Sequence, residues 1–167
     1  MVKTSFDKGS FNFQLHCVVD EWQQILNLLA RILNVPAALI MHTDGQEIEV
    51  FVSSQTTGNP FHPADHESLV GSGLYCEHVI QTSKPLYVPN ALKDPKWSQN
   101  PDVNLGLISY LGFPIKVPSG DVFGTICVLD TKETDYPDDY VELVERFKRV
   151  IELELVRLEN RTGSAVA

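Results

Sequence analysis

The sequence predicts an α+β fold in which an antiparallel sheet is flanked by helices. Two pairs of strand-like segments, at 37–52 and 110–129, each enclose a tight-turn sequence, and apolar residues near both ends of the chain recur at helical spacing. Strands joined by short turns pair in antiparallel fashion, and helices outside such pairs indicate an α+β rather than a doubly wound architecture. The 167 residues have the length of one domain with a substantial core.

The N-terminal segment predicts a helix that begins near residue 20. Residues 1–18 are assigned to a leader, in which the alternating stretch 11–15 is typical of a short strand or of the lead-in to a helix. Asp20 is a suitable N-cap for the helix, which should end before Pro36. Leu28 lies off its apolar stripe. That stripe consists of Trp22, Ile25, Leu26, Leu29, Ile32 and Leu33.

The middle of the chain predicts short strands, loops and small helices. Asp44-Gly45 between the strands 37–42 and 48–52 is the strongest hairpin signal in the sequence. Residues 53–71 are interrupted by glycines and prolines and predict a loop. A helix over about 72–82 and a strand at 86–88 follow. Asp94-Pro95 is typical of the start of another short helix, which carries Trp97.

A second hairpin and a long helix complete the predicted fold. Strands at 110–117 and 122–129 flank the turn 118–121, and a helix with an acidic first turn should run from Asp138 to about Asn160. The domain is therefore assigned to residues 19–161, and residues 162–167 to a tail. The broad apolar stripe of the last helix consists of Tyr140, Leu143, Val144, Phe147, Val150, Ile151, Leu155 and Leu158.

Apolar residues outside the main stripes point to a second contact of the terminal helices. Val141, Leu153 and Val156 fall on other faces of the last helix, as Leu28 does on the first. A helix that packs on one domain needs only a single stripe. The extra positions predict contact with a partner's helix, and hence a homodimer. Scattered surface apolar residues, which are common, are the alternative explanation.

Composition excludes several classes of partner. The formal net charge is −9, and such a surface repels nucleic acid and anionic membranes. No long apolar run and no basic-then-apolar leader occurs, so a cytoplasmic protein is expected. Cys17, Cys76 and Cys127 are scattered, which disfavours a disulfide framework or a zinc site and favours three mostly buried thiols.

Five segments in combination resemble the GAF domain family. They are 73–77 (GLYCE), 84–91 (KPLYVPNA), 94–97 with 100–101, 109–115 (SYLGFPI) and 120–130, and the resemblance covers about residues 20–160. Asn90 departs from the family, which more often has Asp there. The resemblance implies a GAF/PAS-like central antiparallel β-sheet of five to six strands. Short helices would cover the ligand-pocket face, and the N- and C-terminal helices would pack on the other face and commonly form a dimer bundle.

The resemblance also implies a function. Similar domains are bacterial sensors attached to histidine kinase, diguanylate cyclase or chemoreceptor outputs. We therefore expect a non-catalytic module that binds a small molecule of unknown identity and signals through its terminal helices. A dimerisation module without a ligand is the alternative. The candidate pocket residues, which could equally be core, are Tyr75, Cys76, Trp97, Asn104, Tyr110, Phe113 and Cys127.

Other chemistries are less well supported by the sequence. Cys76 aligns approximately with a cysteine of free methionine sulfoxide reductases, but residues 90–106 contain no further cysteine and Cys127, on a strand, is a poor resolving partner. The motifs of bilin-attaching domains are missing, and Cys76 and His78 at i, i+2 do not face each other on a helix. Residues that loosely match cyclic-nucleotide domains are Asn100, Lys132, Tyr136 and Asp139. Haem binding stays open as an alternative, and its candidate ligands are His42, His62, His66 and His78.

Overall fold

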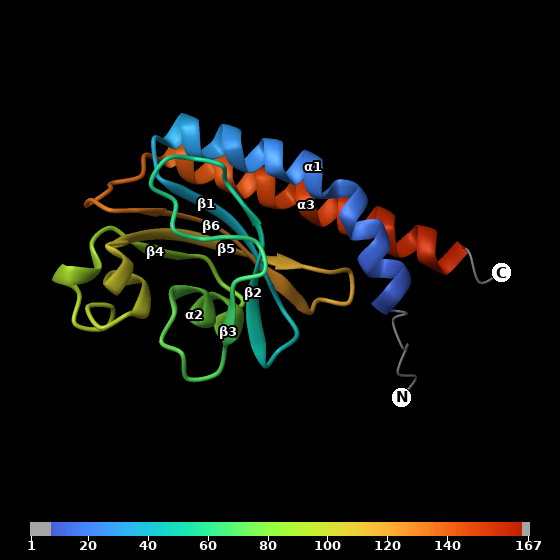
Figure 1. Cartoon of the computed structure of the whole chain (residues 1–167), viewed down its shortest axis with the longest axis horizontal. Helices are drawn as coiled ribbons and strands as arrows, with labels where there is room; N and C mark the ends of the chain where they lie inside the picture. The colour runs from blue at the N-terminus through green and yellow to red at the C-terminus, as the bar shows by residue number, and fades with distance from the viewer. Residues whose placement is uncertain (1–7, 165–167) are drawn as a thin grey trace.

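The computed structural model of the chain describes residues 8–164 and the side chains of residues 15, 16, 18–161 and 163. Its elements form three layers (Figure 1). Helices α1 (Lys8–Leu33) and α3 (Asp138–Ser164) lie side by side over one face of the sheet. Helix α2 (Tyr75–Thr82) and the loops lie on the other face. We call these the helix-covered and the loop-covered face.

The central layer is a six-stranded sheet with the order β3-β2-β1-β6-β5-β4. Every neighbouring pair is antiparallel, which confirms the predicted α+β class and the number of strands. The long strands β1 and β6 lie at the centre, so their backbone donors and acceptors are paired on both sides. The strands are β1 (Ala37–Thr43), β2 (Glu47–Ser53), β3 (His66–Ser68), β4 (Leu86–Val88), β5 (Ser109–Lys116) and β6 (Val122–Asp130).

The helix-covered face holds the larger apolar core. Trp22 and Leu26 of α1 and Ile151 of α3 are fully buried there against the sheet. The Trp22 indole donates a hydrogen bond to the Glu154 carboxylate and so ties α1 to α3. Glu152 is buried and accepts a hydrogen bond from the Lys116 backbone at 2.9 Å, which ties α3 to β5. Apolar burial on this scale is the main source of stability for a domain of this size.

Both terminal helices are longer than the sequence predicts. Helix α1 begins at Lys8, so the stretch 11–15 is helical and Asp20 lies exposed within the helix. The N-cap prediction for Asp20 was wrong because Leu15, which is 2% exposed, extends the buried stripe toward the N-terminus. Residues 8–18 of the assigned leader are thus part of the helix. Helix α3 runs past Asn160 to Ser164 and so includes residues assigned to the tail.

The loop-covered face differs from the prediction in two places. Strand β3 lies within the predicted loop 53–71, and its three residues are all exposed, so no apolar alternation marked it. No helix starts at Asp94, because residues 95–99 form turns in which Asp94 Oδ1 accepts a hydrogen bond from the Lys96 backbone at 2.9 Å. Two short 3-10 helices, η1 (Ala91–Lys93) and η2 (Pro101–Leu105), flank these turns.

Candidate functional site

Strands β5 and β6 decide which candidate residues meet on the loop-covered face. Gly112 pairs with Cys127, and Phe113 pairs with Ile126. Because successive side chains of a strand point to opposite faces, Tyr110 and Cys127 face α2, whereas Phe113 faces the terminal helices. Phe113 therefore belongs to the helix-covered core, and its assignment to the pocket was wrong.

Three aromatic rings form one wall of the site. The rings of Tyr75 and Tyr110 are stacked, with centroids 4.7 Å apart, and Trp97 lies 5.4 Å from Tyr75. Tyr75 donates a hydrogen bond from its hydroxyl to the Leu107 carbonyl at 3.3 Å. The Tyr110 ring lies over Gly112, where an added methyl group would collide with the Tyr110 hydroxyl. A glycine at 112 is thus required for this placement of Tyr110.

Two thiols meet beneath α2. Cys76 and Cys127 are both buried, and their sulfur atoms lie 4.0 Å apart. Cys76 Sγ also lies 3.3 Å from the Tyr110 hydroxyl and 3.3 Å from Thr125 Oγ1. The hydrogen bond with Cys127, opposed by burial, lowers the pKa of the Cys76 thiol. The same hydrogen bond, with burial, raises the pKa of Cys127, so the negative charge of the pair is favoured on Cys76. The side chain of Cys17 lies outside the described residues.

A small cavity lies between these side chains and the loops. Its volume is about 20 Å³, comparable to the space needed for one water molecule. One side is apolar, and the polar side combines two thiols, a phenol and two carboxylates. The lining residues are Leu39, Met41, Phe61, Leu74 and Leu129, with Glu67, Cys76, Asp102, Tyr110 and Cys127.

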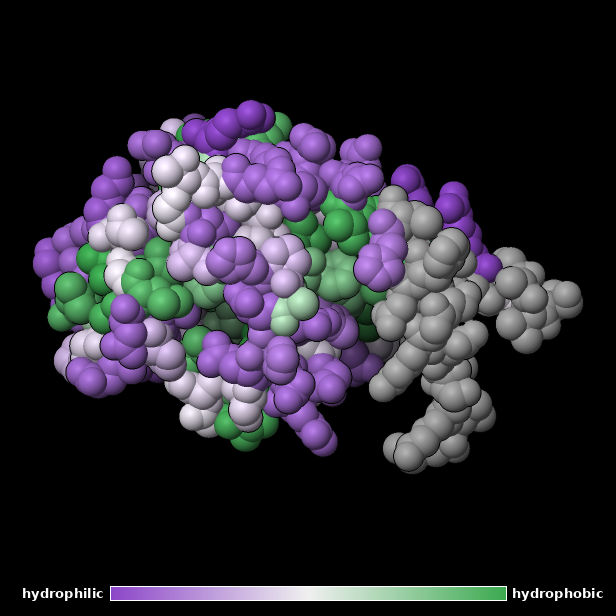
Figure 2. All heavy atoms as spheres, viewed as in Figure 1, coloured by the Kyte–Doolittle hydropathy of each residue, from purple (hydrophilic) through white to green (hydrophobic). Residues whose placement is uncertain are grey.

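Trp97 and Asn104 lie at the margin of this site. Trp97 is 7% exposed and contacts Tyr75, with His78 packed edge-on against it at 5.5 Å. Asn104 is exposed on η2 and does not line the cavity. Within η1 and η2, Ala91 and Asp102 are the buried residues, while Leu92 and Leu105 remain exposed. Figure 2 shows apolar side chains gathered on the surface at the left of the view, where these short helices lie in Figure 1. Asp102, not Asn104, is therefore the polar residue that η2 contributes.

Asp102 is the residue that sequence reasoning missed. Asn100 caps η2 by accepting a hydrogen bond from the Asp102 backbone at 2.9 Å, and its amide donates to the Gly73 carbonyl at 2.8 Å. These bonds join η2 to the start of α2 and bring Asp102 to the cavity. Burial, with the charge of Glu67 added, raises the pKa of the Asp102 carboxyl to about 7. The segment Asn100-Pro101-Asp102 indicated a turn, but nothing in it signalled burial.

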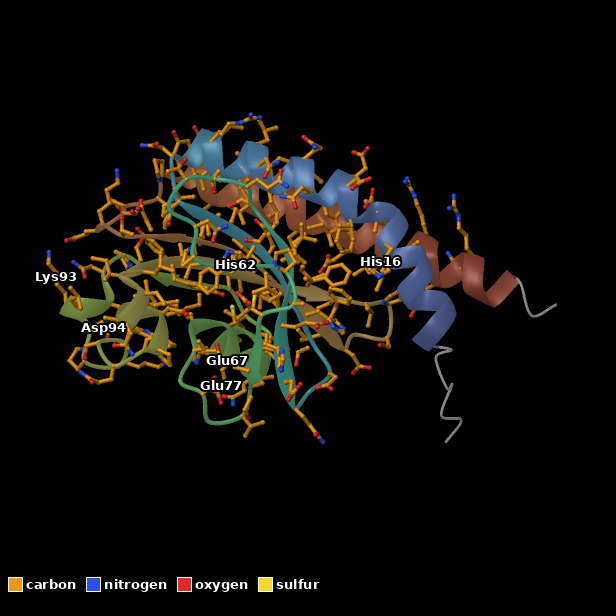
Figure 3. The ribbon with its side chains drawn as sticks, viewed as in Figure 1. His16, His62, Glu67, Glu77, Lys93 and Asp94 are labelled. Carbon is orange, nitrogen blue, oxygen red and sulfur yellow. The ribbon has the colours of Figure 1, made fainter. Side chains whose placement is uncertain are left out.

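Glu67 and Glu77 both lie on the side of the sheet away from the terminal helices (Figure 3) but differ in role. Glu67 is exposed on β3 and lines the cavity. Glu77 is buried on α2, where its carboxylate accepts hydrogen bonds from the Gly73 backbone at 2.8 Å and the Gln81 amide at 3.0 Å. Glu77 thus shapes the turn before α2 and is fully used there.

Among the residues considered for other cofactors, His42 and His66 line one hollow with Asp44, Glu47 and Glu49, whereas the cyclic-nucleotide candidates are separated. Tyr136 packs in the helix-covered core, whereas Asn100 caps η2 on the loop-covered side. His42 lies 3.1 Å from Glu49 in an open, polar hollow at the β1–β2 hairpin, and His62 is exposed. Within the part of the chain that is described, no group of three or more His, Cys, Asp or Glu could hold a metal ion. No described helix has the length and apolar character of a membrane span.

The four apolar residues assigned to a dimer contact separate into two kinds. Leu28 is 42% exposed and Leu153 46% exposed, so both lie on the outer surface of the helices. Val141 is partly buried against the protein's own core, and Val156 is partly buried as well. Ile32 at 42% and Val150 at 41% are exposed beside the first pair. The outer apolar surface of the terminal helices thus consists of Leu28, Ile32, Val150 and Leu153.

Comparisons with solved structures place this geometry among known domains. The GAF domain of PixJ from Thermosynechococcus elongatus, in its blue-light absorbing form, aligns with a TM-score of 0.75 at 11% identity, over 92% of this chain and 93% of that one. The GAF domain of an Acinetobacter phosphoenolpyruvate-protein phosphotransferase aligns with a TM-score of 0.65 at 16% identity, over 94% of each chain. A type II free methionine-R-sulfoxide reductase from Thermoplasma acidophilum aligns with a TM-score of 0.63 at 10% identity, over 89% of this chain and 94% of that one.

These identities show a shared fold, and the family itself is shown by the sequence. Among curated proteins, none matches the chain significantly. GAF domains are mostly sensory or regulatory modules. The family model for the GAF domain matches residues 19–155. The chain therefore belongs to the GAF domain family.

Proposed function

We propose that this domain is a sensor that binds a small molecule at the loop-covered face. The observation that carries the proposal is the buried polar cluster of Cys76, Asp102, Tyr110 and Cys127 around one cavity. Small-ligand sites combine apolar walls with a few convergent polar groups, and that is the composition of this lining. A core that served packing alone would have no need of a buried carboxylate to which no described residue donates a hydrogen bond, as is the case for Asp102.

The strands provide a route from the cavity to the terminal helices. Cys127 lines the cavity, and its neighbour Ile126 packs beneath the helices on the same strand. The start of α1 and the end of α3 lie at the same end of the molecule (Figure 1). A ligand that bound one arrangement of the sheet more tightly would shift the population of helix arrangements with it. An output module joined to these helices would receive that signal.

A thermal-shift screen of small metabolites on the full chain tests the binding step. A ligand of this site should raise the Tm of the wild type and fail to do so for Cys127→Val, whose extra carbon fills the cavity. Leu153→Glu, which changes the outer surface of α3, serves as the matched control and should keep the response. Hydrogen exchange in α1 and α3 should also change with the ligand. Hits that act equally on Cys127→Val, or a screen without hits, would refute the proposal.

Homodimerisation is a second candidate function, supported by the outer apolar surface of Leu28, Ile32, Val150 and Leu153. Leu28 and Ile32 are i, i+4 neighbours and Val150 and Leu153 i, i+3 neighbours, so each pair lies on one side of its helix. A second copy of the chain presents the same two stripes, which is the requirement for a two-fold contact. Sedimentation velocity should find a dimer that Leu28→Glu with Leu153→Glu converts to a monomer. A monomeric wild type at high micromolar concentration would exclude the dimer.

Thiol chemistry is a third candidate, favoured by the 4.0 Å separation of Cys76 and Cys127. Two thiols can reduce a sulfoxide to a sulfide, with the oxygen leaving as water and the thiols joining as a disulfide. Free methionine sulfoxide with dithiothreitol as the recycling reductant is the direct assay. Turnover that is lost in Cys76→Ser and in Cys127→Ser would support a reductase. Equal rates in the wild type and both variants would exclude it.

A further inference from the structure

Asp102 is unusual among the buried carboxylates of the described chain. Glu77 and Glu152 accept backbone hydrogen bonds, and Asp130 accepts one from the Thr134 hydroxyl at 2.8 Å. The Asp102 side chain is buried, with the residue 8% exposed, and no described residue donates a hydrogen bond to its carboxylate. An ionised carboxylate in such a place is unfavourable unless a donor or a cation approaches it. The Asp102 carboxylate therefore needs a donor or a cation from outside the described residues.

The surroundings of Asp102 determine the sign of a suitable partner. Among the residues that the structure describes, no lysine, arginine or histidine lines the cavity, and Glu67 adds a second carboxylate at its margin. The other polar groups are the phenol of Tyr110 and the two thiols. An anionic ligand would meet only like charges and weak donors there. A cation would gain from both carboxylates at once.

We propose that the cavity binds the cationic head of a small organic molecule, of the amine or amidine class, with Asp102 as its counter-ion. This inference rests on the proposed function, since it requires the loop-covered face to be a ligand site. The N–H groups of such a head would donate to the Asp102 carboxylate. Leu39, Met41 and Phe61 would contact its apolar part.

The size of the cavity adds a condition on how the ligand enters. A space of about 20 Å³ is smaller than an amidine group, so part of the lining must move on binding. Residues 54–74 run along the β2 edge of the sheet, where Ala64 and Val50 are hydrogen-bonded, and contribute Phe61, Glu67 and Leu74 to the lining. Ala64 in this segment has φ of 72°, a left-handed backbone that is unfavourable for a residue other than glycine. This covering segment is therefore the part expected to open.

Protonation of Asp102 provides an independent test of its pairing with a cationic ligand. With its pKa near 7, Asp102 holds a proton below neutrality, which a cation must displace, whereas above neutrality the carboxylate is free to pair. The titratable groups that face it are Glu67 of β3, Tyr75 and Cys76 of α2, Tyr110 of β5 and Cys127 of β6. Binding of an amidinium should therefore be about tenfold weaker at pH 6 than at pH 8.

Two sets of nearly isosteric probes test the proposal on the full chain. One set is acetamidinium, acetamide and acetate, and the other is benzamidinium, benzamide and benzoate. Calorimetry and amide chemical shifts at pH 8 should show an amidinium binding at least tenfold more tightly than its amide and carboxylate counterparts. Asp102→Asn should abolish that preference and the pH dependence. Asp121→Asn, at an exposed turn, is the control and should change neither.

The outcomes separate this inference from the proposed function. Amides or carboxylates that bind at the same residues as well as the amidinium would overturn the cationic assignment and leave the ligand site standing. An amidinium that binds Asp102→Asn as tightly as the wild type would also overturn it. Failure of all six probes overturns the cationic assignment, whereas the metabolite screen decides the ligand site separately.

Discussion

The two faces of the sheet are buried to a similar degree but with different chemistry. Beneath α1 and α3 the side chains are almost all apolar, and the buried Glu152 there is fully paired. Beneath α2 and the loops the core includes two thiols, two phenols and an indole, and Asp102 lies beside it with no hydrogen-bond donor from any described residue. The helix-covered face therefore contributes mainly stability, while the loop-covered face gives up some stability for polar groups that the proposed ligand would contact.

The largest effect is expected from truncation on the helix-covered face. Ile126 is fully buried, so Ile126→Ala should lower the free energy of unfolding by about 4–5 kcal/mol, through lost burial and the cavity left behind. Its neighbour on the other face is the matched control, and Cys127→Ala should cost about 1 kcal/mol or less. Urea denaturation measures both. Equal losses would contradict the division between the faces.

Removal of the Asp102 charge should stabilise the protein, and only at higher pH. The pKa of Asp102 is about 7 in the folded state, whereas the ordinary value of 3.8 applies to the unfolded chain. Between these two pH values the folded state therefore binds more protons than the unfolded state. The free energy of unfolding must then fall as pH rises from about 4 to 7, by about 2–4 kcal/mol for this group. Asp102→Asn should remove this loss and be more stable than the wild type at pH 8, by urea denaturation.

The neighbouring carboxylate tests the cause of that pH dependence. Glu67 raises the pKa of Asp102, so Glu67→Gln should shift the fall in stability to lower pH without abolishing it. An unchanged pH profile in Asp102→Asn would show that another group titrates.

A medium effect is expected where Tyr110 lies over Gly112. The methyl group of Gly112→Ala would collide with the Tyr110 hydroxyl, which must then leave Cys76. Such overpacking costs about 1–3 kcal/mol, and it should also alter the near-ultraviolet circular dichroism of the tyrosine cluster. Gly163→Ala, near the end of α3 with open space around it, is the control. If both variants behave alike, the packing of Tyr110 on Gly112 is not a constraint.

The smallest effect is expected at the contact between the terminal helices. Trp22→Phe removes the indole donor to Glu154 and should cost about 1–2 kcal/mol, part of it from the half-buried carboxylate left without its donor. Glu154→Gln keeps an acceptor oxygen and should cost less. Thermal denaturation of the two variants makes the comparison. A greater loss in Glu154→Gln would mean that the carboxylate has a further role.

Local patterns predicted most of the secondary structure. Asp44-Gly45 and the turn 118–121 both lie between the strands that they predicted, because tight turns depend on a few residues with suitable backbone preferences. The start of α1 was missed because an acceptable cap at Asp20 says nothing of whether the residues before it can also pack. Strand β3 was missed because an edge strand with three exposed residues has no apolar pattern.

The candidate site was predicted in outline only. Tyr75, Cys76, Tyr110 and Cys127 were named and do come together, whereas Phe113 was placed on the wrong face. A shift of one residue along a strand reverses the side to which a side chain points, and the register was not known in advance. Asp102 was passed over because an acidic residue beside a proline usually lies in an exposed turn.

The sequence by itself determined the class of fold, the two hairpins and the family, since these depend on periodicity and turn chemistry within short segments. Only the tertiary structure decided which residues share a face, that Cys76 and Cys127 are neighbours, and that Asp102 is buried with no donor in the described part of the chain. These features depend on the register of β5 with β6 and on the hydrogen bonds of Asn100 to Asp102 and Gly73. Burial and the electrostatics that follow from it arise from contacts between distant segments, and no local pattern records them.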